Sequence, residues 1–245
     1  MEAQQKQLPN FVTWIIKHYQ QRLNWDCGLS CVLMCLKDEK REDILKDVPA
    51  LCREEGFGQS TWTIDLCYLI KNKAAELNFL YTTVTLGVDP GYANQAFYDT
   101  IMKKDNERVN RRFKEAAEKD IVVEKRSVDT LDLINHLAYK GVCIVLTNAN
   151  LLSCETCENK SCFGGRNEVS KCLSWCGVKT AYQGHYVVMC GYNLPQRKII
   201  YRNPGAHDCE CVMSFERFDD ARTSYGTDED VVFLDLDLEQ QVTGA

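Results

Sequence analysis

The spacing of apolar and polar positions predicts helices mainly in the first half of the chain and strands mainly in the second. Residues 27–36 are apolar almost all round a helix, which predicts a helix buried in a core. Helical spacing also predicts helices over 41–48, 60–70, 94–119, 129–139 and 215–222. Short runs rich in β-branched and aromatic residues predict strands over 78–86, 121–124, 142–147, 185–190, 198–202 and 231–236. This order predicts one α+β domain over residues 1–245.

Residues 149–182 interrupt this pattern, because they are rich in Cys, Gly, Ser, Asn and Lys and have no clean period. We interpret them as an inserted loop. The insert holds two close cysteine pairs, Cys154 with Cys157 and Cys172 with Cys176, which makes these four residues candidate ligands of a structural zinc ion. Free thiols and a redox-labile disulfide are the alternatives. Cys209 and Cys211 receive no role.

The composition is ordinary for a soluble globular protein, with 45% hydrophobic and 26% charged residues. The net charge of −6 argues against a nucleic-acid partner or an anionic membrane. No signal peptide and no apolar run of roughly 20 residues are found, so we expect a cytoplasmic protein, with the nucleus also open, and no membrane insertion. The 14 cysteines are then expected to be thiols or metal ligands. The pattern does not predict an oligomeric state.

The start of the apolar helix at 27–36 is a candidate reactive site. Asp26 is a candidate N-cap, which makes Cys27 the first helical residue. The helix dipole and the unpaired N–H groups at this end favour a thiolate, which is the nucleophilic form of cysteine. Gln21 lies six residues upstream, and its side-chain amide is a candidate donor to an oxyanion beside that sulfur.

A cysteine nucleophile also needs a base, and His185 is the candidate because it opens a predicted buried strand. Asn203 follows the next strand and could accept a hydrogen bond from the imidazole. A cysteine, then a histidine, then an Asn or Asp, far apart in the sequence, is the arrangement described for cysteine nucleophiles. The predicted catalytic set is therefore Cys27, His185, Asn203 and Gln21.

Several motifs carry a resemblance to a known family. They are WDCGL at 25–29, WTIDL at 62–66, GV at 87–88, GHYVV at 184–188, GY at 191–192 and ARTSYGTDED at 221–230. In this order they resemble the guanylyl cyclase domain-containing protein family of animals and plants, from about residue 12 to 237. The resemblance covers nearly the whole chain, and its last motif is long and specific.

That family in turn resembles papain-fold peptidases of the bacteriocin-processing type. This resemblance implies a papain-like fold, in which a central nucleophile helix packs on an antiparallel sheet, and a peptide or protein substrate. It also implies Cys27 as nucleophile, His185 as base, Asn203 as the residue that orients it, and Gln21 as oxyanion donor. Three positions depart from the pattern: Ser30 stands for Ala, Asn203 for Asp, and Gln20 precedes Gln21.

The family name implies a different chemistry, the conversion of GTP into cyclic GMP. The sequence has no Gly-rich phosphate loop, and we interpret the carboxylates of Asp235 and Asp237 as solvated charge. The acidic run at 227–230 is interpreted as a structural turn near Arg222. We therefore predict a papain-like cysteine-dependent hydrolase whose triad needs no cofactor. A guanylyl cyclase and a non-catalytic papain-fold interaction protein are the alternatives.

Overall fold

A large mixed sheet forms the centre of the computed structural model, which describes residues 7–56, 58, 60–88, 98–157 and 182–244. Its strands are β1 (Phe11–Trp14), β2 (Phe79–Thr83), β3 (Val123–Lys125), β4 (Gly141–Asn148), β5 (Gly184–Asn193), β6 (Lys198–Arg202), β7 (Cys211–Ser214), β8 (Val231–Asp235) and β9 (Gln241–Gly244). The strand order is β3-β2-β8-β4-β5-β1-β9, and β6 pairs with both β5 and β7. Only the β2–β3 pair among these described strands is parallel.

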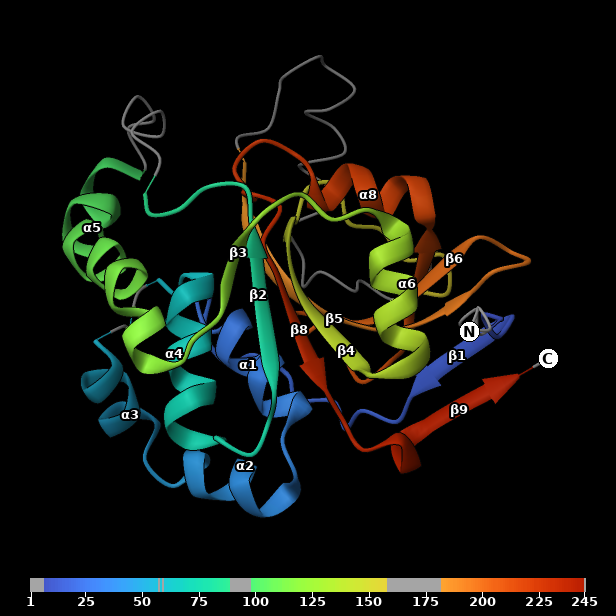
Figure 1. The fold of residues 1–245 in the computed structure, drawn as a ribbon, viewed down its shortest axis with the longest axis horizontal. Coiled ribbons are helices and arrows are strands. Elements are labelled where there is room, and N and C mark those ends of the chain that lie inside the picture. Colours follow the sequence, from blue (N-terminus) through green and yellow to red (C-terminus); the bar gives the residue numbers. More distant parts are fainter. Residues whose placement is uncertain (1–6, 57, 59, 89–97, 158–181, 245) are drawn as a thin grey trace, which may run out of the picture.

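Helices cover both faces of this sheet (Figure 1). They are α1 (Cys27–Cys35), α2 (Asp38–Leu45), α3 (Val48–Glu55), α4 (Thr63–Lys73), α5 (Tyr98–Glu115), α6 (Thr130–Tyr139) and α8 (Phe215–Arg222), with short 3-10 helices η2 (Ala117–Lys119) and η3 (Leu238–Gln240). Figure 1 shows α1 to α5 gathered on one side and α6 and α8 on the other. The structure thus combines helices with a large, mostly antiparallel sheet, while the papain-like fold stays a prediction.

Helix α1 begins at Cys27, as predicted, and every residue of it is buried. It packs on α4 and on β5. Gly28 permits this close approach, because an added Cβ would lie 3.0 Å from both terminal carbons of Leu66 and 3.1 Å from Cδ2 of Tyr186. A buried helix with apolar residues all round is what the sequence pattern predicted.

Asp26 is at the N-cap of α1, as predicted, but its carboxylate does not bond to the helix end. Its carboxylate instead accepts from the backbone N–H groups of Arg22, at 3.1 Å, and Leu23, at 3.0 Å. The carboxylate of Asp26 therefore stabilises the loop that precedes α1, and not the first turn of the helix.

Some element boundaries also differ from the predicted ones. The single helix expected at 41–48 is two helices, α2 and α3, and Pro49 lies in the first turn of α3 instead of ending a helix. Proline is tolerated there because a first-turn N–H has no partner within the helix, and Asp47 caps α3 by accepting from the N–H of Ala50 at 2.8 Å. Strands β1, β7 and β9 were not predicted, because their residue patterns are short or mixed.

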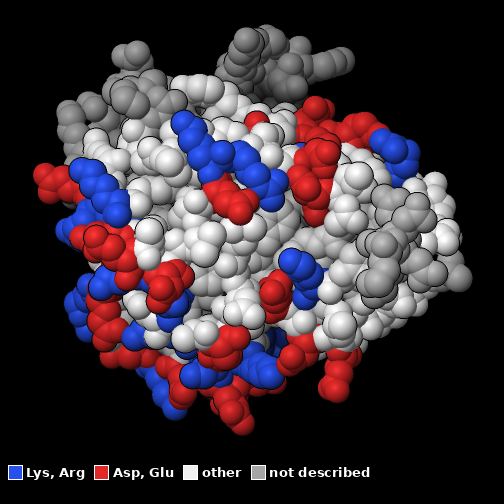
Figure 2. Space-filling model, viewed as in Figure 1, with Lys and Arg blue, Asp and Glu red and all other residues white. Residues whose placement is uncertain are grey.

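Charged side chains of both signs are mixed on the face shown in Figure 2, with no broad patch of one sign. This face therefore lacks the clustered basic residues that a nucleic-acid surface needs. Among the helices in the described ranges, none combines the length and the apolarity that a bilayer crossing requires.

Candidate functional site

The structure brings His185 and Asn203 together in the interior. His185 is on β5, and Asn203 follows directly after β6, the strand that pairs with β5. The ring Nε2 of His185 lies 2.8 Å from Oδ1 of Asn203. Asn203 is fully buried and His185 is 9% exposed, so this bond is shielded from water. The predicted pairing of these two residues is confirmed, while their catalytic roles stay a prediction.

Gly205 identifies the tautomer of the His185 ring. Its backbone N–H donates to the same Oδ1 atom of Asn203 at 2.9 Å, and a backbone N–H can only donate. Oδ1 is therefore an acceptor, so Nε2 of His185 must carry the hydrogen in their shared bond. In a neutral ring, Nδ1 then carries the lone pair that can accept a proton, so Nδ1 is the basic nitrogen. Burial lowers the pKa of His185, and the hydrogen bond to Asn203 opposes this shift.

Cys27 is beside the strand that carries His185. The backbone groups of Tyr186, the residue after His185, and of Gly28 act to lower the pKa of its thiol, which favours the thiolate. Burial outweighs them and raises the pKa of the Cys27 thiol to about 11, and the negative charge of Asp26 adds to the increase. The prediction that the helix end holds Cys27 as a thiolate is therefore wrong for this structure, because the side chain is only 7% exposed.

Gln21 lies close to His185 and Asn203, but its side-chain amide is not arranged as an oxyanion donor. Its side-chain Nε2 donates to the carbonyl oxygen of Leu23 at 2.7 Å, and its backbone N–H donates to the carbonyl of Pro204 at 2.8 Å. A Cβ built on Gly205 would lie 3.3–3.5 Å from atoms of Asn203, Gln21 and His185, so these three side chains surround Gly205. The predicted role of Gln21 would require its amide to leave Leu23.

A buried polar network behind Cys27 was not predicted. Thr63 hydrogen-bonds both to the hydroxyl of Tyr186, at 2.9 Å, and to the carboxylate of Asp230. The hydroxyl of Tyr81 donates to that carboxylate at 2.9 Å. Burial raises the pKa of Asp230 to about 7, although these hydrogen bonds oppose the shift. Thr63 lies in the motif at 62–66 and Asp230 in the motif at 221–230. These motifs therefore contain residues of the network, although the spacing of residues along the sequence does not show that they meet.

The acidic run at 227–230 also forms the structural turn that the sequence predicted. The hydroxyl of Thr227 donates to the carbonyl of Arg222 at 2.6 Å, and Asp228 and Glu229 have positive φ angles of 49° and 52°. This tight turn places Asp230 directly before β8, with its carboxylate directed into the polar network. The turn is therefore structural, and its last residue is part of the buried site.

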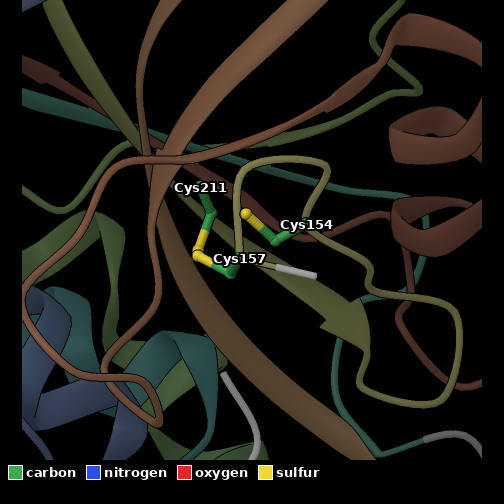
Figure 3. Close-up of side chains that lie close together, drawn as sticks. All are labelled: Cys154, Cys157 and Cys211. Carbon is green, nitrogen blue, oxygen red and sulfur yellow. The ribbon is translucent and has the colours of Figure 1, made fainter. Parts of the chain in front are cut away.

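The predicted zinc ligands are only partly described. Cys172 and Cys176 lie outside the described residues, so the predicted four-cysteine set stays a prediction. Cys154 and Cys157 point toward Cys211 (Figure 3), and the three sulfur atoms all lie within 4.8 Å of one another. In the described ranges this is the one group of three or more Cys, His, Asp or Glu residues placed to bind a metal ion.

Comparison with known proteins decides the family. Residues 16–234 match the family model described as "Guanylylate cyclase". The chain belongs to this family. The protein named "Guanylyl cyclase 1" of Arabidopsis thaliana is 32% identical over 233 residues, which cover 94% of this chain and 79% of that relative. The family resemblance inferred from the motifs is thus confirmed, whereas the relation to papain-fold peptidases stays a prediction.

Proposed function

We propose that this chain is a cysteine-dependent hydrolase of acyl bonds, with Cys27 as nucleophile, His185 as base and Asn203 as the residue that positions His185. The observation that carries the proposal is the tautomer of His185, which Gly205 and Asn203 fix with Nδ1 as the basic nitrogen. The packing of α1 on β5 supports it, because the Tyr186 backbone, which directly follows His185, lies close enough to the Cys27 sulfur to affect its pKa.

The pKa shifts indicate how such a reaction would start. The pKa of Cys27 is raised and that of His185 is lowered, so thiol and imidazole are both neutral near pH 7. The Cys27 proton would move to Nδ1 of His185 as the sulfur bonds to the acyl carbon. His185 would then give that proton to the leaving group. Water would cleave the thioester with His185 again taking a proton, which restores the free thiol and releases the acid.

A small activated ester, p-nitrophenyl acetate, tests the proposal without knowledge of the natural substrate. We expect the full-length chain to release p-nitrophenolate and to carry an acetyl group on Cys27, as detected by peptide mass spectrometry. Cys27→Ala and His185→Ala should lose both signals. Cys52→Ser is the matched control, because Cys52 is a partly exposed thiol on α3 that takes no part in the site. Release that is unchanged in Cys27→Ala would overturn the proposal.

Guanylyl cyclase activity is the second candidate function. The comparisons with known proteins favour it, whereas the geometry of the site favours the hydrolase. The support for cyclase activity is the description of the family and the printed name of the Arabidopsis relative. In such a reaction the 3′ oxygen of GTP attacks the α-phosphorus and releases pyrophosphate. Of the carboxylates considered from the sequence, Asp237 forms an exposed ion pair with Lys37 at 3.0 Å, as expected of solvated charge.

The two candidates are separated by one assay on one pair of proteins. Wild type and Cys27→Ala are incubated with GTP and either Mg²⁺ or Mn²⁺, and cyclic GMP and pyrophosphate are measured by mass spectrometry. Equal formation of cyclic GMP by both proteins would establish the second candidate and show that it does not need Cys27. Absence of cyclic GMP from the wild type under both metals would reject it. Absence of both activities would support the interaction-protein alternative.

A further inference from the structure

Four cysteines from two distant segments of the chain meet beside the β6–β7 hairpin. The sulfur atoms of Cys154, Cys157 and Cys211 lie within 4.8 Å of one another and point toward a common centre (Figure 3). The sulfur of Cys209 lies 3.3 Å from that of Cys157 and 3.9 Å from that of Cys211. In a tetrahedral zinc site with Zn–S bonds of about 2.3 Å, the sulfur atoms are separated by about 3.8 Å. The two spacings of Cys209 lie on either side of this value. Its sulfur is not one of the three that all lie within 4.8 Å of one another, so shared binding of one ion requires Cys209 to move closer to Cys154.

Backbone and side-chain hydrogen bonds hold the two segments together. The N–H of Glu155 donates to the carbonyl of Val212 at 2.8 Å, and the hydroxyl of Thr156 donates to the carbonyl of Glu210 at 3.0 Å. The hydroxyl of Tyr201, on β6, donates to the carbonyl of Ser153 at 2.8 Å. The cysteine-bearing segment 154–157 is therefore fixed against β6 and β7, which places its thiols in advance.

From this geometry we propose that Cys154, Cys157, Cys209 and Cys211 bind a structural Zn²⁺ ion. Four thiolates in a compact cluster suit zinc, because soft sulfur ligands and tetrahedral geometry are its preference in closed structural sites. The set differs from the one predicted from the insert, in which Cys172 and Cys176 supplied the second pair. Cys209 and Cys211 were overlooked there, although residues i and i+2 of an extended chain point to the same face.

Such an ion would connect the insert to the candidate active site. The loop between β6 and β7 begins with Asn203 and carries Cys209 near its end, and Cys211 is the first residue of β7. A zinc ion would anchor the far end of this loop to residues 154–157, which belong to the insert. The proposed role of the ion is therefore to order the loop, and it is independent of which reaction the chain catalyses.

Metal analysis of the purified full-length chain tests the proposal, with two double variants as the decisive contrast. We expect about one zinc per chain in the wild type, loss of zinc in Cys209→Ser/Cys211→Ser, and retained zinc in both Cys172→Ser/Cys176→Ser and the control Cys52→Ser. Zinc lost from Cys172→Ser/Cys176→Ser but kept in Cys209→Ser/Cys211→Ser would overturn the proposal. Iron in place of zinc, or no bound metal in the wild type, would overturn it as well.

A measurement on the wild type avoids dependence on how the variants fold. Alkylation of the native chain followed by peptide mapping should leave Cys154, Cys157, Cys209 and Cys211 unmodified. After zinc is removed with a chelator, these four should become modified, whereas Cys52 should react equally in both samples. A Cys157–Cys209 disulfide in the non-reduced map, or equal labelling of the four thiols before and after chelation, would contradict the proposal.

Discussion

The imidazole Nε2 of His185 donates a hydrogen bond to Oδ1 of Asn203 over 2.8 Å, and this bond decides which ring nitrogen is basic. Asn203→Ala would leave the buried Nε2–H without its acceptor and allow the other tautomer. In a serine protease triad, the wrong histidine tautomer lowers kcat by about 10⁴. We expect acetylation of Cys27 by p-nitrophenyl acetate to fall at least about 100-fold in Asn203→Ala.

Asn203→Asp is the matched variant, because it keeps the acceptor and adds a negative charge beside the ring. It should restore most of the acetylation rate and move the pH profile, since a carboxylate raises the pKa of His185. A purely structural role for Asn203 would change stability in both variants without shifting the pH profile of either. That outcome would contradict the positioning role.

Cys27 should behave as a buried thiol, not as a preformed thiolate. Its pKa is raised to about 11, and only the thiolate reacts with iodoacetamide. We therefore expect its alkylation rate to rise about tenfold for each pH unit between pH 8 and 10, since the thiolate fraction rises by that factor below the pKa. Peptide mass spectrometry measures the rate at this one residue. A plateau that begins near pH 7 would show that the thiolate already exists in the resting protein.

The stability of the fold should decrease as pH rises toward neutrality, through Asp230. Its pKa is raised from 3.8 to about 7, so the folded chain holds this proton more tightly than the unfolded chain. The resulting stabilisation is complete below about pH 4 and is lost as pH rises through 7, on the order of 4 kcal/mol in all. The unfolding free energy of Asp230→Asn, measured in urea, should not show this decrease between pH 5 and pH 8. The exposed carboxylate variant Asp43→Asn should keep it.

A buried ion cluster should be essential for the packing of α4 against α5. Asp65 is fully buried and accepts from Arg112 at 2.7 Å and from Arg108 at 2.9 Å. Asp65→Asn removes the charge that both guanidinium groups face, and we expect it to cost about 3–5 kcal/mol of unfolding free energy. The exposed Lys46–Asp43 pair is the control, because Lys46→Ala should change stability by less than about 0.5 kcal/mol. If Asp65→Asn and Lys46→Ala changed the unfolding free energy by the same amount, the buried cluster would not be essential for this packing.

Gly141 should tolerate no side chain. A Cβ at this position would lie 1.9 Å from the carbonyl oxygen of Leu234, within the β4–β8 pairing. The strands would have to separate, so we expect Gly141→Ala to cost at least about 3 kcal/mol, the upper part of the range for overpacked sites. Gly58→Ala, where an added Cβ meets nothing within 4 Å, should leave the thermal midpoint unchanged. Similar midpoints for the two variants would show that the sheet can adjust.

The sequence reveals those features that follow from local pattern. The start of α1 at Cys27 was predicted because Asp26, a candidate N-cap, directly precedes an apolar run. His185 and Asn203 were identified because each borders a strong strand pattern. The raised pKa of Cys27 could not be predicted, since it depends on burial by α4 and β5, which lie far away in the sequence. The helix boundary predicted at residue 48 is wrong for a local reason, because the proline that follows it lies in the first turn of α3, where proline is also favoured.

The position of α1 has a consequence for synthesis on the ribosome. The helix packs on β5, whose residues, 184–193, are translated long after residue 35. Until then the nascent chain carries an apolar segment without the surface that covers it, and exposed apolar segments of this kind favour aggregation. We therefore expect a fragment that ends before residue 184 to be insoluble without a chaperone, whereas the full-length chain can enclose α1 as soon as β5 pairs with β4.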